Sequence, residues 1–170
     1  MSIEDFLALP DGVRAEFVDG VAIVSPPGTW EHQGVALVVA MAVKSALPDL
    51  TVATECGVRT SASSFRIADV GVADVTPEGR FAETPPLVVV EVLSTSTRSE
   101  DTVRKSTEYA AVGVAQYWIV DRDAGSLTAY GNNGAGWDVL LELDETQQQG
   151  RVEIGDHGPV ELDLVSILAG

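Results

Sequence analysis

The segment Leu87–Leu93 constrains the fold more than any other part of the chain. Six of its seven residues are apolar and most of them are β-branched, which is typical of a strand that is buried on both faces. A helical pattern follows at Thr102–Val112, and Gln116–Val120 is a further apolar strand. A strand, a helix and a strand in this order predict a right-handed crossover between two parallel neighbours.

Other helices and strands are expected on both sides of this unit. Asp19-Gly20 supplies the positive φ angles of a two-residue hairpin turn, and Thr29 can cap a largely apolar helix that ends near Leu47. A short helix and further strands are predicted at 3–9, 15–18, 21–25, 51–53, 58–60, 67–75, 127–130, 137–143 and 151–154. We therefore expect a mixed α/β fold, with a central mixed sheet flanked by helices, in one domain over residues 1–170.

Composition narrows the class of protein. The single cysteine, Cys56, excludes a disulfide scaffold and a cysteine-rich zinc site, so a reducing cytoplasm is the expected location. No apolar stretch is long enough to span a bilayer, and we expect no membrane partner. The formal net charge is −16, from 26 acidic and 10 basic residues, which argues against tight electrostatic binding of nucleic acid.

Acidic residues in the predicted strands are the first candidates for a site. Glu91 lies within the buried strand, where a glutamate needs a partner, although it could also mark a strand end beside an arginine or solvent. Asp69 and Asp74 share the preceding strand at an odd spacing, so they face opposite sides of the sheet. Only one of the two can join Glu91, and the periodicity does not decide which.

Lys105 lies on the helix that follows the Glu91 strand. Its spacing to Asp101 and Glu108 favours a ladder of charges on an exposed helix face. Glu16, in the first strand of the predicted hairpin, is equally consistent with an ordinary exposed glutamate. These charges suggest chemistry only when they are taken as a set.

As a set, they resemble the Uma-type restriction endonuclease family, a branch of the PD-(D/E)XK nuclease superfamily. The resemblance covers residues 16–130, about two thirds of the chain. It rests on the order and spacing of Glu16–Gly20, Ser25–Pro27, His32, Asp69-Val70, Pro85–Ser94, Asp101, Lys105, Tyr109, Gly113-Val114 and Tyr117–Asp121. It implies a restriction-endonuclease-like core and hydrolysis of DNA phosphodiester bonds.

The resemblance also implies roles for individual residues. Asp69 and Glu91 would be carboxylate ligands of Mg²⁺, or of Mn²⁺ as a substitute, and the carbonyl of Val92 would be a third protein ligand. Lys105 would orient the attacking water or offset developing charge, and Glu16 would be an outer or second-metal carboxylate.

Two positions depart from the superfamily pattern. Leu93 stands where a lysine is common, so Lys105 must reach back from the helix, and Ala68 replaces the usual proline before the first aspartate. Neither change removes a ligand. His32 and Tyr109 lie at positions that the resemblance marks, and it implies accessory roles for them, although a lone histidine such as His32 is more often structural.

The sequence thus predicts a Mg²⁺-dependent endonuclease that binds DNA weakly and with help from the metal. The alternative is a nuclease-fold protein that no longer cuts and serves as a binding or regulatory partner, which the net charge favours. Arg66, Arg98 and Arg104 are the expected contacts with the DNA backbone, because they fall in the least acidic third of the chain. A homodimer would let one site act on each strand.

Overall fold

The computed structural model of the protein describes residues 1–10, 12–94 and 100–170. Within these residues the main sheet consists of β1 (Ala15–Val18), β2 (Val21–Val24), β3 (Thr51–Ser61), β4 (Ser64–Ala73), β5 (Phe81–Ala82), β6 (Val88–Leu93), β7 (Gln116–Asp121), β8 (Ser126–Asn132) and β9 (Trp137–Leu143). A second sheet pairs β10 (Gln149–Ile154) with β11 (Gly158–Asp163). The helices are α1 (Ile3–Leu7), α2 (Trp30–Ala46), α3 (Ser106–Val112) and α4 (Leu164–Leu168), and the π-helical turn η1 (Glu100–Lys105) leads into α3.

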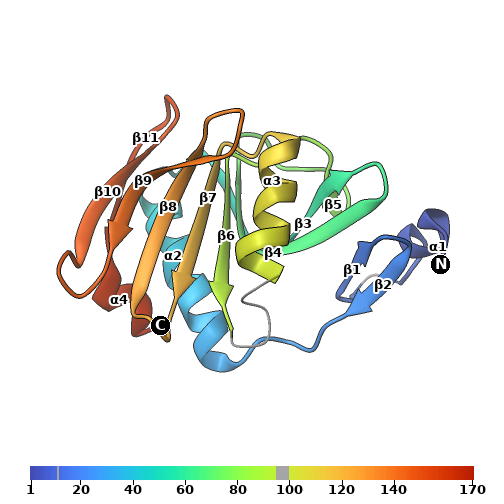
Figure 1. Ribbon diagram of the computed structural model, residues 1–170, viewed down its shortest axis with the longest axis horizontal. Helices are drawn as coiled ribbons and strands as arrows, with labels where there is room; N and C mark the ends of the chain where they lie inside the picture. The colour runs from blue at the N-terminus through green and yellow to red at the C-terminus, as the bar shows by residue number, and fades with distance from the viewer. Residues whose placement is uncertain (11, 95–99) are drawn as a thin grey trace.

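The main sheet is mixed and runs in the order β2-β1-β4-β6-β7-β8-β9, with β3 paired to β4 and β5 paired to β3. β6 and β7 are parallel neighbours in register from Val88↔Gln116 to Leu93↔Asp121, as the crossover pattern predicts. Helices α2 and α3 lie on opposite faces of the sheet (Figure 1). The expected mixed α/β fold with flanking helices is confirmed.

Helix α2 packs on one face of the sheet and supplies much of the larger core. Val35, Val39 and Val43 are fully buried there, at helical spacing, against side chains of β4, β6, β7 and the second sheet. Thr29 caps the helix as expected, since its hydroxyl accepts a hydrogen bond from the backbone N–H of His32 at 3.3 Å. This cap fixes the start of the helix near Asp69 of β4 and Glu91 of β6.

The hairpin formed by β1 and β2 is held by a small aromatic core. Asp19 and Gly20 both have positive φ angles, 51° and 79°, as a two-residue turn of this kind requires. Phe17 of β1 stacks on Phe6 of α1, with ring centroids 4.9 Å apart, and two further phenylalanines, Phe65 and Phe81, complete the cluster. The hairpin is thereby anchored next to β4.

Several elements differ from the sequence-based expectations. The first helix ends at Leu7, two residues earlier than expected, and the two predicted strands at 51–53 and 58–60 form one continuous β3. β11 and α4 were not predicted at all. No helix of the described residues is both long and apolar enough to cross a membrane.

Candidate active site

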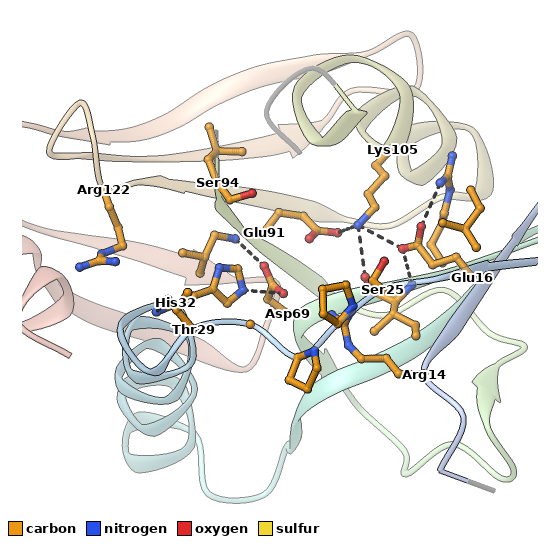
Figure 2. A pocket seen from close by; sticks show the side chains of 18 of the residues that line it. Arg14, Glu16, Ser25, Thr29, His32, Asp69, Glu91, Ser94, Lys105 and Arg122 are labelled. Atoms are coloured by element: carbon orange, nitrogen blue, oxygen red, sulfur yellow. Dashed lines mark hydrogen bonds and ion pairs between the residues drawn. The ribbon is translucent and has the colours of Figure 1, made fainter. Parts of the chain in front are cut away.

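A cleft of about 620 Å³ opens where the carboxyl ends of β6 and β7 meet the start of α2 and the β1–β2 hairpin. Its walls come from six separate parts of the chain, so only the folded sheet brings them together (Figure 2). Its charged and polar lining includes Arg14, Glu16, His32, Arg66, Asp69, Glu91, Arg104, Lys105 and Arg122.

Asp69 lies where β4 and β6 stop pairing. The last ladder pair towards the cleft is Val70↔Val90, and beyond it the Asp69 carboxylate takes the place of a backbone acceptor. Its Oδ2 accepts the N–H of Val92 at 2.8 Å, and its Oδ1 lies 3.0 Å from Nε2 of His32. A strand residue directs its N–H and C=O to the same side, so the carbonyl of Val92 also faces this gap.

Glu91 is 2% exposed and is held by two donors on its Oε1 atom. The ammonium of Lys105 lies 3.1 Å away and the hydroxyl of Tyr109 lies 3.0 Å away. Burial is the main cause that raises the pKa of Tyr109 well above its usual value of 10.0, and the charge of Glu91 adds to it. Tyr109 therefore stays protonated and remains a hydrogen-bond donor to Glu91 at every physiological pH.

Lys105 is buried and points into the cleft rather than along the helix surface. Its Nζ lies 3.1 Å from Glu91, 3.2 Å from Glu16 and 3.3 Å from the carbonyl of Ile67. The interpretation of Lys105 as a member of an exposed charge ladder is therefore wrong. The resemblance, which has Lys105 reach back towards the Glu91 strand, describes its position correctly.

Glu16 joins the hairpin to both β4 and Lys105. Its Oε1 accepts the backbone N–H of Ile67 at 3.0 Å in addition to the contact with Lys105, and its Oε2 accepts from Arg66 at 3.1 Å. These contacts are all with hydrogen-bond donors. They suit a carboxylate that fixes the position of the Lys105 ammonium.

Arg66 does not fit the expected contact with the DNA backbone. Its side chain is 0% exposed, and its guanidinium binds Glu108 at 2.7 and 2.8 Å as well as Glu16. Burial opposes the charged form, but the hydrogen bonds and charges of Glu108 and Glu16 outweigh it and raise the pKa of Arg66. A buried arginine with two carboxylate partners supports the walls of the cleft and does not reach a ligand outside them.

The other two arginines predicted to contact DNA have different outcomes. Arg104 lines the cleft and is partly exposed, but its guanidinium binds Asp19 at 2.6 Å and Glu108 at 3.2 Å. Arg98 lies outside the described residues.

Asp74 lies beyond the end of β4, and its side chain is 68% exposed, with His157 at 3.8 Å. It does not line the cleft. Of the two aspartates between which periodicity could not decide, Asp69 is the one that lies with Glu91.

Two arginines of the cleft were missed in the sequence. Arg14 directly precedes β1, and Arg122 directly follows β7, next to Asp121, the last residue of the motifs that carry the family resemblance. Arg122 could have been found, because the carboxyl ends of parallel β6 and β7 share one edge of the sheet. Arg14 carried no comparable signal.

The cleft differs in charge from the rest of the molecule. Among the described residues, five basic ones line it, namely Arg14, Arg66, Arg104, Lys105 and Arg122. Only four of the described acidic residues do so, namely Glu16, Asp69, Glu91 and Asp123. With formal charges the lining thus sums to +1, in a chain whose net charge is −16. The described lining of the cleft therefore repels an anion less than the net charge of the chain would.

The cleft thus brings Asp69, Glu91 and Lys105 together at the edge of a mixed sheet. The family model described as "Uma2: Putative restriction endonuclease" matches residues 3–164, and the chain belongs to this family. In fold it is similar to a crystal structure from Anabaena variabilis ATCC 29413, titled a "putative nuclease belonging to DUF820", with a TM-score of 0.79 and 15% identity over 99% of this chain and 98% of that chain. No curated protein matches the chain.

Proposed function

We propose that the protein is a Mg²⁺-dependent endonuclease that hydrolyses phosphodiester bonds of DNA. The observation that carries the proposal is the convergence of Asp69, Glu91 and Lys105 in one cleft, from two strands and a helix. Membership of the family and the nuclease-like fold support it.

The donor set of the cleft fits a hard divalent cation. The described residues contain no cluster of three or more His, Cys, Asp or Glu side chains that could hold a metal by themselves. Mg²⁺ usually binds one or two carboxylates and completes its shell with water and substrate phosphate, so Asp69, Glu91 and the carbonyl of Val92 suffice. Each carboxylate oxygen of Asp69 contacts one donor, so each keeps a lone pair for a further ligand. When bound, Mg²⁺ would lower the pKa of a water and stabilise charge on the phosphate.

The protein groups around this set hold the reacting parts in place. Lys105 places a positive charge beside Glu91, where it can orient the attacking water or offset negative charge on the phosphate. Glu16 fixes that ammonium from the other side, and Tyr109 restrains the Glu91 carboxylate. This arrangement is built before substrate arrives, which avoids the cost of ordering it during the reaction.

The alternative is a protein of this fold that binds a partner without cutting. Two observations favour it: the net charge of −16, and the pairing of Lys105 with both Glu91 and Glu16. A DNA cleavage assay distinguishes the two functions, since only an enzyme hydrolyses DNA. A homodimer would bring a second site to the opposite strand. Light scattering of the purified protein, with and without a DNA duplex, measures the molar mass and so tests for this dimer.

The first test is cleavage of plasmid and single-stranded DNA at low salt with Mg²⁺, Mn²⁺ or EDTA. We expect cleavage only with the divalent ion, and a loss of at least about 100-fold in Asp69→Asn and in Lys105→Ala, because each removes an interaction made in the transition state. Asp74→Asn and Lys44→Ala are the matched controls, since Asp74 is exposed away from the cleft and Lys44 binds the carbonyls of Pro48 and Leu50. If no DNA is cut under any of these conditions, the non-catalytic function replaces this one.

A further inference from the structure

We propose that Arg14 and Arg122 bind phosphates on either side of the phosphate that is cleaved, so that the substrate is a nucleic-acid strand several nucleotides long. This inference rests on the proposed function and identifies which part of the substrate the cleft recognises. Arg66 and Arg104, which were expected to contact the DNA backbone, form ion pairs with carboxylates. The inference assigns contacts with the DNA backbone to two other arginines of the same cleft.

The topology of the sheet places the two arginines on opposite sides of the centre. In the order β1-β4-β6-β7, Asp69 and Glu91 lie on the two inner strands. Arg14 precedes the first of these four strands, and Arg122 follows the last. Figure 2 shows the same arrangement, with Asp69 and Glu91 between the two guanidinium groups. Strands lie about 4.8 Å apart, so β1 and β7 are separated by about 14 Å.

That separation corresponds to several nucleotides of one strand. At about 3.4 Å of duplex axis per nucleotide, 14 Å corresponds to about four nucleotides at most, and to fewer in an extended strand. A phosphate bound by Asp69, Glu91 and Lys105 would therefore have neighbours within reach of both arginines. A mononucleotide or a small phosphodiester would reach neither.

Arg122 is available for such a contact. Its side chain is exposed, and it interacts electrostatically with Glu31 without a direct ion pair to a described residue. The turn that carries it is fixed, because the carboxylate of Asp121 accepts the backbone N–H of Ala124 at 3.0 Å.

Among the described residues, Arg14 has an ion-pair partner at the Nε edge of its guanidinium only. Its Nε lies 3.3 Å from the Glu55 carboxylate, which also accepts a hydrogen bond from Gln33 of α2 at 2.9 Å. Glu55 interrupts the β3–β4 ladder with a φ of 51°, opposite the position of Asp69. The side chain of Arg14 is 27% exposed, and no ion pair or hydrogen bond with a described residue engages its two terminal nitrogens. A guanidinium oriented in this way can offer both terminal nitrogens to one phosphate.

The experiment compares a polymer with a small substrate. Values of kcat/KM are measured for a 20-nucleotide strand and for bis(p-nitrophenyl) phosphate, which has no neighbouring phosphates. We expect Arg14→Ala and Arg122→Ala each to lower kcat/KM for the strand roughly 5- to 20-fold, and to leave the small substrate within about twofold. Arg151→Ala is the control, because it makes the same change in net charge on exposed β10, outside the cleft.

Binding of the same strand is measured in parallel in Glu91→Gln, which serves as a background without turnover. For each phosphate that a variant no longer binds, the slope of log K against log salt should become shallower by about 0.7 for a single strand. If the two arginine variants match Arg151→Ala in both measurements while the wild type cuts DNA, the inference is wrong and the proposed function stands. An equal loss for both substrates would also overturn it. If the wild type cuts neither substrate, the proposed function fails, and the salt slopes alone decide whether the two arginines bind phosphate.

Discussion

At the scale of single residues, the cleft depends on charges that are buried in pairs. Arg66 is fully buried between Glu108 of α3 and Glu16 of β1, so it connects the helix that carries Lys105 to the hairpin that carries Glu16. Burial opposes ionisation of Glu108, but the hydrogen bonds and charge of Arg66 outweigh it and lower the pKa of Glu108 below its usual value of 4.5. Breaking such a pair is costly, because the remaining buried charge loses its partner.

Glu108→Gln should therefore destabilise the protein by about 2 to 4 kcal/mol at neutral pH. Because the pKa of Glu108 is lower in the folded state, its contribution is present above pH 4.5 and is lost as the pH falls through the folded value. The free energy of unfolding, measured with urea from pH 7 to pH 3, should thus differ most between wild type and variant at neutral pH. The difference should shrink in acid.

Glu142→Gln is the control for this measurement, since Glu142 is exposed on β9. We expect it to change the free energy of unfolding by less than about 0.5 kcal/mol. A difference between wild type and Glu108→Gln that stayed constant down to pH 3 would show that Glu108 does not stabilise the fold as a carboxylate.

The sequence identified Asp69 and Glu91 as candidates because an acidic residue in an apolar strand is anomalous wherever that strand is buried. It could not assign Lys105 by itself. Helical spacing shows which residues share a face, whereas the choice between an exposed ladder and a cleft depends on what packs against that face. Here Glu16 of the distant hairpin and Glu91 of β6 both meet the Lys105 ammonium. Only the family resemblance anticipated this position.

At the scale of elements, predictions succeeded where a local signal fixes the backbone. Thr29 at the start of α2 and Gly113 at the end of α3 are examples, since a cap and a left-handed residue act within one helical turn. The β10–β11 sheet and α4 were harder to predict, because β11 alternates exposed and buried residues and takes its place only by pairing with β10. The sequence also did not predict that residues 51–61 form a single strand. Glu55 has a φ of 51° within β3, and residues other than glycine seldom adopt such an angle inside a strand.

Gly113→Ala tests the end of the helix that carries Tyr109. Gly113 has a φ of 90°, and a Cβ atom there would meet nothing within 4 Å, so the cost is conformational and not steric. We expect the free energy of unfolding in urea to fall by about 1 to 2 kcal/mol. Gly113→Asn should lose less, because asparagine tolerates the left-handed region better than alanine. Equal stability of the glycine and alanine proteins would contradict this account of how α3 ends.

At the scale of the whole molecule, charge is distributed unevenly between the cleft and the rest of the chain. A net charge of −16 repels a polyanion, whereas the described residues that line the cleft sum to a charge close to neutral. The metal would then supply much of the attraction between protein and phosphate. For the same reason, any added salt stabilises the fold somewhat by screening repulsion, and a specific effect of Mg²⁺ must be measured against NaCl of equal ionic strength.

Under that control, Mg²⁺ should stabilise the wild-type protein. At about 100 times the dissociation constant the gain is about 2.7 kcal/mol, which raises Tm by roughly 5 to 11 °C for a chain of this size. Asp69→Asn should abolish the shift, and Asp74→Asn should retain it, because only Asp69 lies in the cleft. Glu91→Gln should also abolish it and, by leaving the buried Lys105 with one carboxylate fewer, should lower Tm even without metal. A shift that survived in Asp69→Asn would place the metal elsewhere on this acidic surface, and DNA cleavage would then have to be explained without Asp69 as a ligand.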